Sequence, residues 1–505
     1  MLPQAPNDWT PDEAAHLMRR AGFGGSPREI SRFHALGRKA AIESLLDPPD
    51  EEAAFPLPDW TDPDVARKEA REWAAERRKM RGEGAAQEEA RRKFQREIRQ
   101  QNQRRTVEMG GWWMDRILRT QAPLREKMVV FWHDHFATSA QKVRLPRLMM
   151  EQNQRFRRQA FGNFRALTHE MVKDPAMMIY LDTPSSRKGM PNENFAREVM
   201  ELFTLGVGHY TEQDIREAAR ALTGYQLERL TGEVRHVPRR WDEGTKTVCG
   251  ETGAFDGDQL VEVLFRQEAA ASYLPAKLWS YFVEDEAPAS LVKELAEGFR
   301  REDFQLRPLL REIFGSRAFY DSTVVRNQIK SPVQFLVQMA RELELDQWPR
   351  GYALDASQQL GQVLFFPPNV AGWDWGRAWI NTNTLLSRYN IAGTITKGAM
   401  DPEGGSDDMP MATDAERPRL AMLVKASVRR WKGPNYEEMA PRTLRENPEE
   451  LVDRLIARFF HGDPGAKPRA AFIDYAQAKK GVVFTNHEVA ELCHLMMSTP
   501  QYQLC

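Results

Sequence analysis

Cysteine and long apolar runs are both scarce in this sequence. Only three cysteines occur among 505 residues, at Cys249, Cys493 and Cys505, and none belongs to a CxxC or Cys/His spacing. This excludes a disulfide-based fold and the common cysteine metal sites. The longest apolar runs, such as MMIYL, are far shorter than the roughly 20 residues needed to cross a bilayer. We therefore expect a chain without a transmembrane segment.

Neither sign of charge dominates, and familiar cofactor motifs are missing. Lys and Arg number 71 while Asp and Glu number 72, so no global basic field attracts nucleic acid. This balance argues against nucleic acid as a partner. The sequence also lacks a P-loop, GxGxxG, HExxH, GxSxG and a haem-attachment CxxCH. These absences argue against a nucleotide or haem cofactor. The cofactor stays unknown, with a divalent metal as the candidate considered below.

Helical periodicity runs through most of the chain, and no series of alternating strands is evident. Hydrophobic residues make up 41% of the sequence, which is enough for a large core. Thr10-Pro11 and Ser26-Pro27 are typical helix starts, because a capping hydroxyl followed by proline suits the first turn. The sequence therefore predicts an all-α protein, organised as a large irregular multi-helix bundle.

Residues 63–107 form the most biased segment, rich in Arg, Glu, Ala and Gln. This composition predicts one or two long exposed helices, interrupted near Gly82-Glu83-Gly84, that form a charged helical arm. Two interpretations are open. The arm binds a partner or an anionic surface, or it is a solvated helical hairpin held by i,i+4 ion pairs. The interleaving of both charge signs favours the hairpin.

Two further segments depart from helical periodicity. Residues 226–258 carry Gly, Thr, Arg and Val without a helical period, which predicts a small β-hairpin or an ordered loop. Residues 400–418, DPEGGSDDMPMATDAERP in large part, are typical of a flexible linker. We expect a C-terminal helical subregion over 419–505 beyond this linker.

His135 is the sharpest single candidate for chemistry. Steps of 100° per residue along the helix predicted after Pro123 place Leu124, Met128 and His135 on one apolar side, and His133 on the opposite side. A polar ring on an apolar face needs a reason, so His135 is hypothesised to be a metal ligand or a general acid/base. The alternative is a core histidine hydrogen-bonded to a carbonyl or carboxylate, which residue type alone favours.

The segment NENFAREVMELFTLGVGHYTEQDIREAARALTGY predicts a helix, a glycine turn and a second helix. Gly206 and Gly208 permit the turn and Thr211 caps the second helix. The candidate catalytic residues at this corner are His135, Glu198, Glu201 and His209, of which His135, Glu198 and His209 are the candidate metal ligands. The alternative is a structural ion-pair network that locks the two helices, with Glu212, Arg216 and Arg220 as its members.

The stretch FFPPNVAGWDWGRAWINTNTLLSRYN concentrates tryptophans and amides. Indole faces beside amides suit the rings and hydroxyls of a polysaccharide, and they equally suit a protein interface. A third interpretation, which we favour, is that the tryptophans fill the core while the asparagines satisfy turn backbone. The candidate binding residues are Trp373, Trp375, Trp379, Asn381 and Arg388.

Several of these segments together resemble one bacterial family, the domain-of-unknown-function family 1800. The motifs that carry the resemblance are HLMRRAGFGGSPREI, FWHDHFATS, ENFAREVMELFTLGVGHYTEQDIREAARALTGY, KSPVQF, FFPPNVAGWDWGRAWINTNTLLSRYN and HLMMSTPQYQL. They run from His16 to Gln503. The resemblance therefore implies one family-wide helical domain over residues 1–505, with 63–107 as a variable insertion.

The family supplies no assigned reaction. Its members are often exported and are often encoded beside proteins of the domain-of-unknown-function family 1501, which resemble sulfatases and alkaline phosphatases. The resemblance thus implies a sulfatase-like partner and a role in the cell envelope. This N-terminus lacks the basic start and long apolar stretch of a secretory signal, so a cytoplasmic location stays open.

Two functions follow from these observations. The first is a metal-assisted or acid/base hydrolase or lyase that acts on an envelope or extracellular polymer, with the His/Glu corner as its site. The second is a non-catalytic partner or scaffold for a sulfatase-like protein, which predicts an exposed apolar patch that includes the tryptophan loop. The sequence alone leaves open whether the protein is an enzyme.

Overall fold

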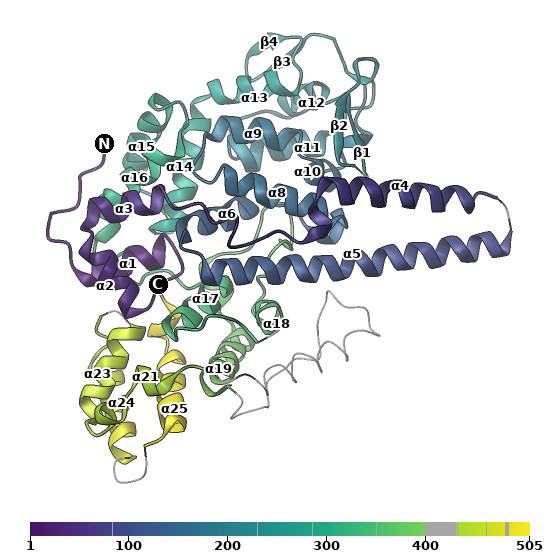
Figure 1. Cartoon of the computed structure of the whole chain (residues 1–505). Coiled ribbons are helices and arrows are strands. Elements are labelled where there is room, and N and C mark those ends of the chain that lie inside the picture. The colour runs from purple at the N-terminus through teal and green to yellow at the C-terminus, as the bar shows by residue number, and fades with distance from the viewer. Residues whose placement is uncertain are drawn as a thin grey trace.

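A computed structural model describes the chain except residues 83, 230, 285, 350, 399–430, 432, 461 and 480–483. Helices dominate the structure, and they pack around one main hydrophobic core from which a two-helix arm projects (Figure 1). The predicted all-α, multi-helix architecture is confirmed. The linker predicted at 400–418 lies outside the described residues. Within the described part, none of the helices combines the length and apolar character that spanning a membrane requires.

Three short helices open the chain, and they begin where the capping residues predict. Thr10 and Ser26 each accept a hydrogen bond from the backbone N–H three residues on, and Glu13 and Glu29 accept bonds from the capping residues in return. Such capping boxes satisfy backbone donors that a helix start leaves free. The helices are α1 (Pro11–Arg20), α2 (Pro27–Ala35) and α3 (Arg38–Leu46).

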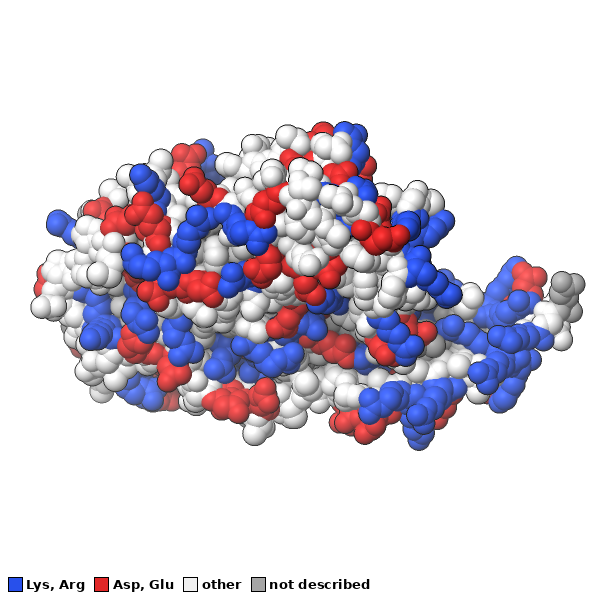
Figure 2. All heavy atoms as spheres, turned by 90° about the horizontal axis from the view of Figure 1, so that it is seen from above, with Lys and Arg blue, Asp and Glu red and all other residues white. Residues whose placement is uncertain are grey.

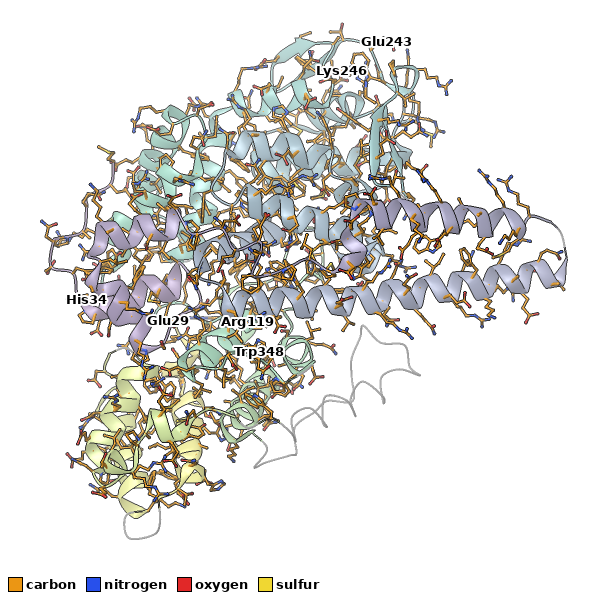
Figure 3. The ribbon with its side chains drawn as sticks, in the orientation of Figure 1. Glu29, His34, Arg119, Glu243, Lys246 and Trp348 are labelled. Atoms are coloured by element: carbon orange, nitrogen blue, oxygen red, sulfur yellow. The ribbon has the colours of Figure 1, made fainter. Side chains whose placement is uncertain are left out.

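The predicted charged insertion folds as a helical hairpin. A 3-10 turn at Asp59–Thr61 leads into α4 (Pro63–Lys79), and α5 (Ala85–Arg119) returns to the body. Within the described part of the arm, α4 buries no residue, and α5 buries residues only from Met109 onward. The arm is therefore the outer part of a continuous 35-residue helix, paired with α4 and rooted in the core. Its side chains project into open space along most of its length (Figure 3).

The central layer follows the arm and contains the segments singled out by their motifs. It includes a π-helix, whose wider turn replaces the end of α11. The elements are α6 (Pro123–His135), α7 (Ala140–Val143), α8 (Pro146–Arg158), α9 (Phe164–Val172), α10 (Pro175–Tyr180), a 3-10 turn (Thr183–Ser185), α11 (Glu193–Glu198), the π-helix (Val199–Thr204) and α12 (Glu212–Ala221).

The segment predicted as a small β-hairpin forms two of them. Strands β1 (Tyr225–Glu228) and β2 (Glu233–His236) pair antiparallel, with Tyr225 opposite His236. Strands β3 (Lys246–Val248) and β4 (Glu251–Gly253) do the same, with Lys246 opposite Gly253. Both lie at one end of the molecule, where Figure 3 labels Glu243 and Lys246. These strands are too short to form a separate layer, and they pack against the neighbouring helices.

The rest of the chain is helical again. The elements that complete the main body are α13 (Gly257–Arg266), α14 (Glu268–Phe282), α15 (Ala289–Arg301), α16 (Leu306–Gly315), a 3-10 turn (Ala318–Tyr320), α17 (Pro332–Glu342), α18 (Tyr352–Gln359), a 3-10 turn (Gly376–Trp379) and α19 (Thr382–Lys397). A C-terminal cluster contains α21 (Tyr436–Met439), α22 (Arg442–Arg445), α23 (Pro448–Phe459), α24 (Ala466–Ala478), α25 (Asn486–Met497) and a last 3-10 turn (Gln501–Gln503).

One buried carboxylate joins three helices of the core. Glu126 of α6 is fully buried, and both of its oxygens accept hydrogen bonds from Arg157 of α8, at 2.7 and 2.8 Å. Arg116 of α5 donates to the same carboxylate at 2.8 Å, and the Trp113 indole N–H does so at 2.9 Å. Burial raises the pKa of Glu126, but the two guanidinium groups outweigh it and hold that pKa below its ordinary value. The cluster fixes α5, and with it the arm, against α6 and α8.

Replacing Glu126 by alanine is expected to lower the free energy of unfolding by about 3–5 kcal/mol, because two buried guanidinium groups lose their carboxylate. Chemical denaturation measures the change, with Glu297→Ala, an exposed position of α15, as the control. Because its pKa is lowered by folding, the ionised carboxylate stabilises the protein at a pH above the ordinary pKa of glutamate. This stabilisation is lost as the pH falls through the pKa of Glu126 in the folded state. A loss below about 1 kcal/mol would contradict the central role given to this residue.

Candidate functional site

The end of α6 places three consecutive polar side chains in the interior. His133, Asp134 and His135 are exposed by 0%, 5% and 1%, respectively. Successive residues of a helix point in directions about 100° apart, so the three side chains contact different parts of the structure. Each has its own set of contacts.

His135 lies among aromatic rings and binds a backbone carbonyl. Its Nε2 is 3.1 Å from the carbonyl oxygen of Phe203, and its ring packs within 6 Å of those of Phe131, Trp132 and Phe136. Burial lowers the pKa of His135 well below its ordinary value, so the ring is neutral and donates this bond. These contacts are those of a core histidine hydrogen-bonded to a carbonyl, which is the alternative to a catalytic role. The remaining ring nitrogen, Nδ1, is buried and has no hydrogen-bond partner among the described residues.

The carbonyl that His135 binds belongs to the π-helix. In a π-helix each N–H bonds five residues back, and here the Leu205 N–H bonds the Met200 carbonyl at 2.8 Å. The Tyr273 hydroxyl of α14 donates to the neighbouring carbonyl of Leu202, also at 2.8 Å. Side chains of α6 and α14 thus satisfy the two carbonyls at the end of the π-helix. Such local widening of a helix is frequent at functional sites, and here it has a structural explanation.

His133 points to the other side of α6, as the helical periodicity predicts. Its Nε2 lies 3.1 Å from the Asn153 side-chain nitrogen, and Asn153 accepts a 2.7 Å bond from Arg157. Because the Asn153 nitrogen can only donate, His133 accepts that bond. His133 therefore extends the buried network around Glu126. Burial, with the Arg157 charge, lowers the pKa of His133 to about 3.

Asp134 holds the tryptophan loop against the body. Its Oδ1 accepts a 2.7 Å bond from the Trp373 backbone N–H, and its Oδ2 accepts a 3.2 Å bond from the Trp375 indole. Gly372 has a φ of +91°, and a Cβ at this position would lie 2.3 Å from Oδ1, so only glycine fits. Burial raises the pKa of Asp134 to about 6, against the opposing effects of these two donors and of Lys277.

The predicted binding residues of this loop differ in exposure. Trp373 and Trp379 are buried, whereas Trp375 exposes 44% of its surface and packs edge-on against Tyr281 at 5.0 Å between ring centroids. Asn381 caps α19 by accepting a bond from the Thr384 N–H at 3.0 Å. The buried Arg388 donates to the Lys330 carbonyl and to the Gln503 side chain. Of the three predicted tryptophans, Trp375 is therefore the one whose ring is accessible to a ligand or partner.

His135 makes its hydrogen bond with the Phe203 carbonyl and not with another residue of the predicted His/Glu corner, whose assembly around His135 stays a prediction. Glu198 and Glu201 are half-buried along the π-helix, whereas His209 is exposed in the glycine turn. Burial and the neighbouring Glu201 charge raise the pKa of Glu198, and Glu201 accepts a hydrogen bond from the Tyr210 hydroxyl. A half-buried carboxyl whose pKa is raised, as that of Glu198 is, can act as a general acid or base. The buried ring of His135 instead faces the aromatic core.

Glu212 and Arg220, which were predicted as members of an ion-pair network, do form ion pairs. Each of them pairs with a residue outside the predicted set. Arg197 of α11 donates two 2.8 Å bonds to Glu212 of α12, which ties the two helices together. Arg220 pairs with Glu217 at 2.6 Å and with Asp242 at 2.9 Å. Arg216 contributes only a longer-range charge, which helps to lower the pKa of Glu212 after the larger effect of Arg197.

A metal site is not evident at the residues expected to form one. Among the described residues, no group of three or more His, Cys, Asp or Glu side chains is arranged to hold a metal ion. The assignment of His135, Glu198 and His209 as ligands stays a prediction. The residues that sequence reasoning missed are Asp134 and Tyr273. A signal for Asp134 was available, since it stands between two histidines in the last turn of its helix. In the structure every side chain of that turn is buried.

The contacts of His135 predict that its removal destabilises the fold. His135→Ala is expected to lower the free energy of unfolding by about 2–5 kcal/mol, because it leaves a cavity among packed rings and frees a buried carbonyl. His209→Ala is the control and is expected to change it by less than about 0.5 kcal/mol, since His209 is exposed. A His135→Ala protein of unchanged stability would argue for a chemical role instead.

The raised pKa of Asp134 predicts a pH-dependent tryptophan loop. A carboxyl whose pKa rises to about 6 on folding stabilises the fold at low pH, and that stabilisation is lost as the pH rises through 6. We expect a change of tryptophan fluorescence with a midpoint near pH 6, because Trp375 and Trp373 bind this group. Asp134→Asn should abolish the transition, and Asp374→Asn, at an exposed neighbour, should retain it. An unchanged transition in Asp134→Asn would refute the assignment.

Comparison with known proteins gives the family but no activity. A family model described as "Protein of unknown function (DUF1800)" matches residues 16–504. No curated protein and no solved structure matches the chain in these comparisons. The matched range spans nearly all of the sequence, from within α1 to the last 3-10 turn, and includes all of the contacts described in this section. The chain therefore belongs to the DUF1800 family, whose function is unknown.

Proposed function

We propose that this protein is a non-catalytic binding protein that docks a partner protein on the exposed face of α19. The observation that carries the proposal is a group of three large apolar side chains on this helix. Leu385, Leu386 and Tyr389 expose 44%, 60% and 49% of their surfaces. Single apolar residues are ordinary on a protein surface. These three are neighbours, because residues three and four positions apart lie side by side on a helix.

The surroundings of this group resemble a protein interface. Asn383 and Asn390 are exposed, and at 100° per residue both fall along one edge of the apolar group. An apolar centre with a polar rim is the common anatomy of interfaces. Tyrosine is among the residues that contribute most to binding energy, and Tyr389 lies between the two leucines on the helix face.

The opposite side of α19 is held firmly by the body. A Cβ at Gly393 would lie 3.1 Å from the His494 ring of α25, so the two helices cross closely. His494 Nε2 lies 2.9 Å from the Tyr389 carbonyl oxygen, and Arg388 binds the Lys330 carbonyl. A face held in this way is already ordered, which lowers the entropic cost of binding.

Other observations favour binding over catalysis. His135, which was expected to do chemistry, binds a backbone carbonyl, and its neighbour Asp134 holds a loop, so the buried polar residues at the end of α6 have structural contacts. The acid/base hydrolase or lyase hypothesis stays a prediction, and of its four residues Glu198, Glu201 and His209 are less buried than His135. The partner that the family resemblance nominates is a sulfatase-like protein of the family 1501. Its contact surface should be an apolar hollow with hydrogen-bonding groups at the edge.

The double variant Leu386→Asp/Tyr389→Asp tests this proposal. It places two charges in the centre of the apolar group, and binding to the family 1501 protein encoded in the same genome is expected to weaken at least about tenfold. Titration of the purified proteins measures the Kd. The control is Leu36→Asp, which changes a leucine that is 51% exposed at the end of α2 and should bind like the wild type.

Two results would overturn the proposal. One is equal affinity of the double variant and the wild type, which would show that the partner uses another surface. The other is the absence of measurable binding by the wild-type protein. Both positions are exposed, but the Tyr389 ring also packs against His494 at 4.4 Å between centroids, so chemical denaturation checks that the double variant is folded. The single variant Leu386→Asp, at a 60% exposed position, is expected to keep the wild-type stability within about 1 kcal/mol and to weaken binding as well.

A further inference from the structure

The projecting arm differs from the rest of the molecule in charge. Residues 63–107 contain 14 Lys and Arg against 8 Asp and Glu, a formal charge of +6 in a chain whose net charge is −1. Figure 2 shows blue Lys and Arg side chains gathered on the projecting arm, with fewer red carboxylates between them. The body is correspondingly acidic. Such asymmetry determines which partners a surface attracts.

On α5 the basic residues form a ridge. Arg92, Arg96 and Arg99 are four and three residues apart, so they lie next to one another on the helix surface. All three are exposed. At 100° per residue the ridge lies opposite the stripe of Phe94 and Ile98, which are half-buried.

The opposite stripe is the side of α5 that contacts α4. Gln101 and Arg105, which continue the stripe of Phe94 and Ile98, both donate hydrogen bonds to Glu69 of α4, Arg105 at 2.9 Å. Packing between the two helices therefore uses the far side of α5. The arginine ridge is left pointing away from the hairpin.

The ridge arginines have weak attachments to the protein itself. Arg92 pairs with Glu88, but both side chains are more than half exposed, and such surface pairs contribute little. Arg99 donates a long 3.3 Å bond to the backbone carbonyl of Gln95. Arg96 has no ion-pair partner among the described residues. Their guanidinium groups are thus available to an external anion.

Amide side chains accompany the ridge. Gln95 and Gln100 are exposed, and Gln103 is half-buried one turn further along. A guanidinium group binds a carboxylate or sulfate through two parallel hydrogen bonds. An amide both donates and accepts, which suits a hydroxyl group. Together the two side-chain types match a ligand with anionic groups and hydroxyls on one chain.

Other polyanions fit less well. In the described part of the arm, one large apolar residue, Val65, is exposed. The arm therefore lacks the apolar face with which a helix enters a membrane surface. Trp73 and Phe94 are half-buried, which leaves no stacking platform for single-stranded nucleic acid. Duplex DNA carries one charge per ~1.7 Å. The arm spreads its +6 over two paired helices, of which the α5 part within residues 63–107 is roughly 35 Å long, and this suits a more sparsely charged polymer.

We propose that the arm binds an acidic polysaccharide along the ridge of Arg92, Arg96 and Arg99. The arginines hold carboxylate or sulfate groups, and the glutamines bind the hydroxyls between them. The ridge lies on the arm and the proposed protein-docking face lies on α19, so the two assignments stand on different observations. Failure of one leaves the other intact.

The experiment compares three proteins and three polymers. The triple variant Arg92→Gln/Arg96→Gln/Arg99→Gln removes the ridge charges and keeps good helix formers, so the arm stays helical, which far-UV circular dichroism checks. Arg158→Gln/Arg301→Gln/Arg317→Gln removes the same charge from exposed positions of the body. Each protein is titrated with polygalacturonate, with neutral dextran and with duplex DNA. The ridge variant should bind polygalacturonate at least about tenfold more weakly than the wild type, and the body variant should be within about threefold of it.

The wild-type affinity for polygalacturonate should also fall with added salt, and less steeply in the ridge variant. Three outcomes overturn the proposal. The wild type binds polygalacturonate no better than dextran, the ridge variant binds it as well as the wild type, or duplex DNA binds more tightly than polygalacturonate and loses its affinity in the ridge variant. The last outcome would make the arm a nucleic-acid contact.

Discussion

The carboxylate of Glu126 is the contact on which the rest of the structure depends. It is fully buried and is shared by two guanidinium groups and an indole from α5 and α8. A buried charge of this kind is tolerated only when every partner is in place. The position of α6 relative to α5 and α8 is therefore defined closely. The positions of the polar residues at the end of α6 are fixed as a result. Through hydrogen bonds from these residues, the positions of the π-helix and the tryptophan loop are fixed as well.

Local signals in the sequence predicted much of this fold. Thr10 and Ser26 cap helices as expected, the 63–107 insertion is a helical arm, and the periodicity placed His133 and His135 on different sides of α6. These features depend on neighbours a few residues away. The contact between Asp134 and Trp373 joins residues 239 positions apart, and no local pattern reveals it.

The candidate site was harder to predict for a related reason. The residues of the π-helix would fit an ordinary α-helix equally well, and the two carbonyls at its end are bound by His135 and Tyr273, which come from two distant helices. Without that knowledge, a buried histidine near two glutamates is typical of a metal or acid/base site. In the same way, the sequence does not reveal that Asp134 and Gly372 pack the start of the tryptophan loop closely against α6. The surfaces on which the two proposals rest are on α19 and on the arm.

The continuity of α5 has a mechanical consequence. The helix runs without a break for 35 residues, from Ala85 at the outer end of the arm to Arg119, just past Arg116 beside Glu126. A stiff rod fixed at one end converts a small sideways force at its tip into a torque at its base. Any load on the arm is thus transmitted to the buried ion cluster, where three helices meet. The protein has the geometry of a lever whose fulcrum is a fully buried carboxylate.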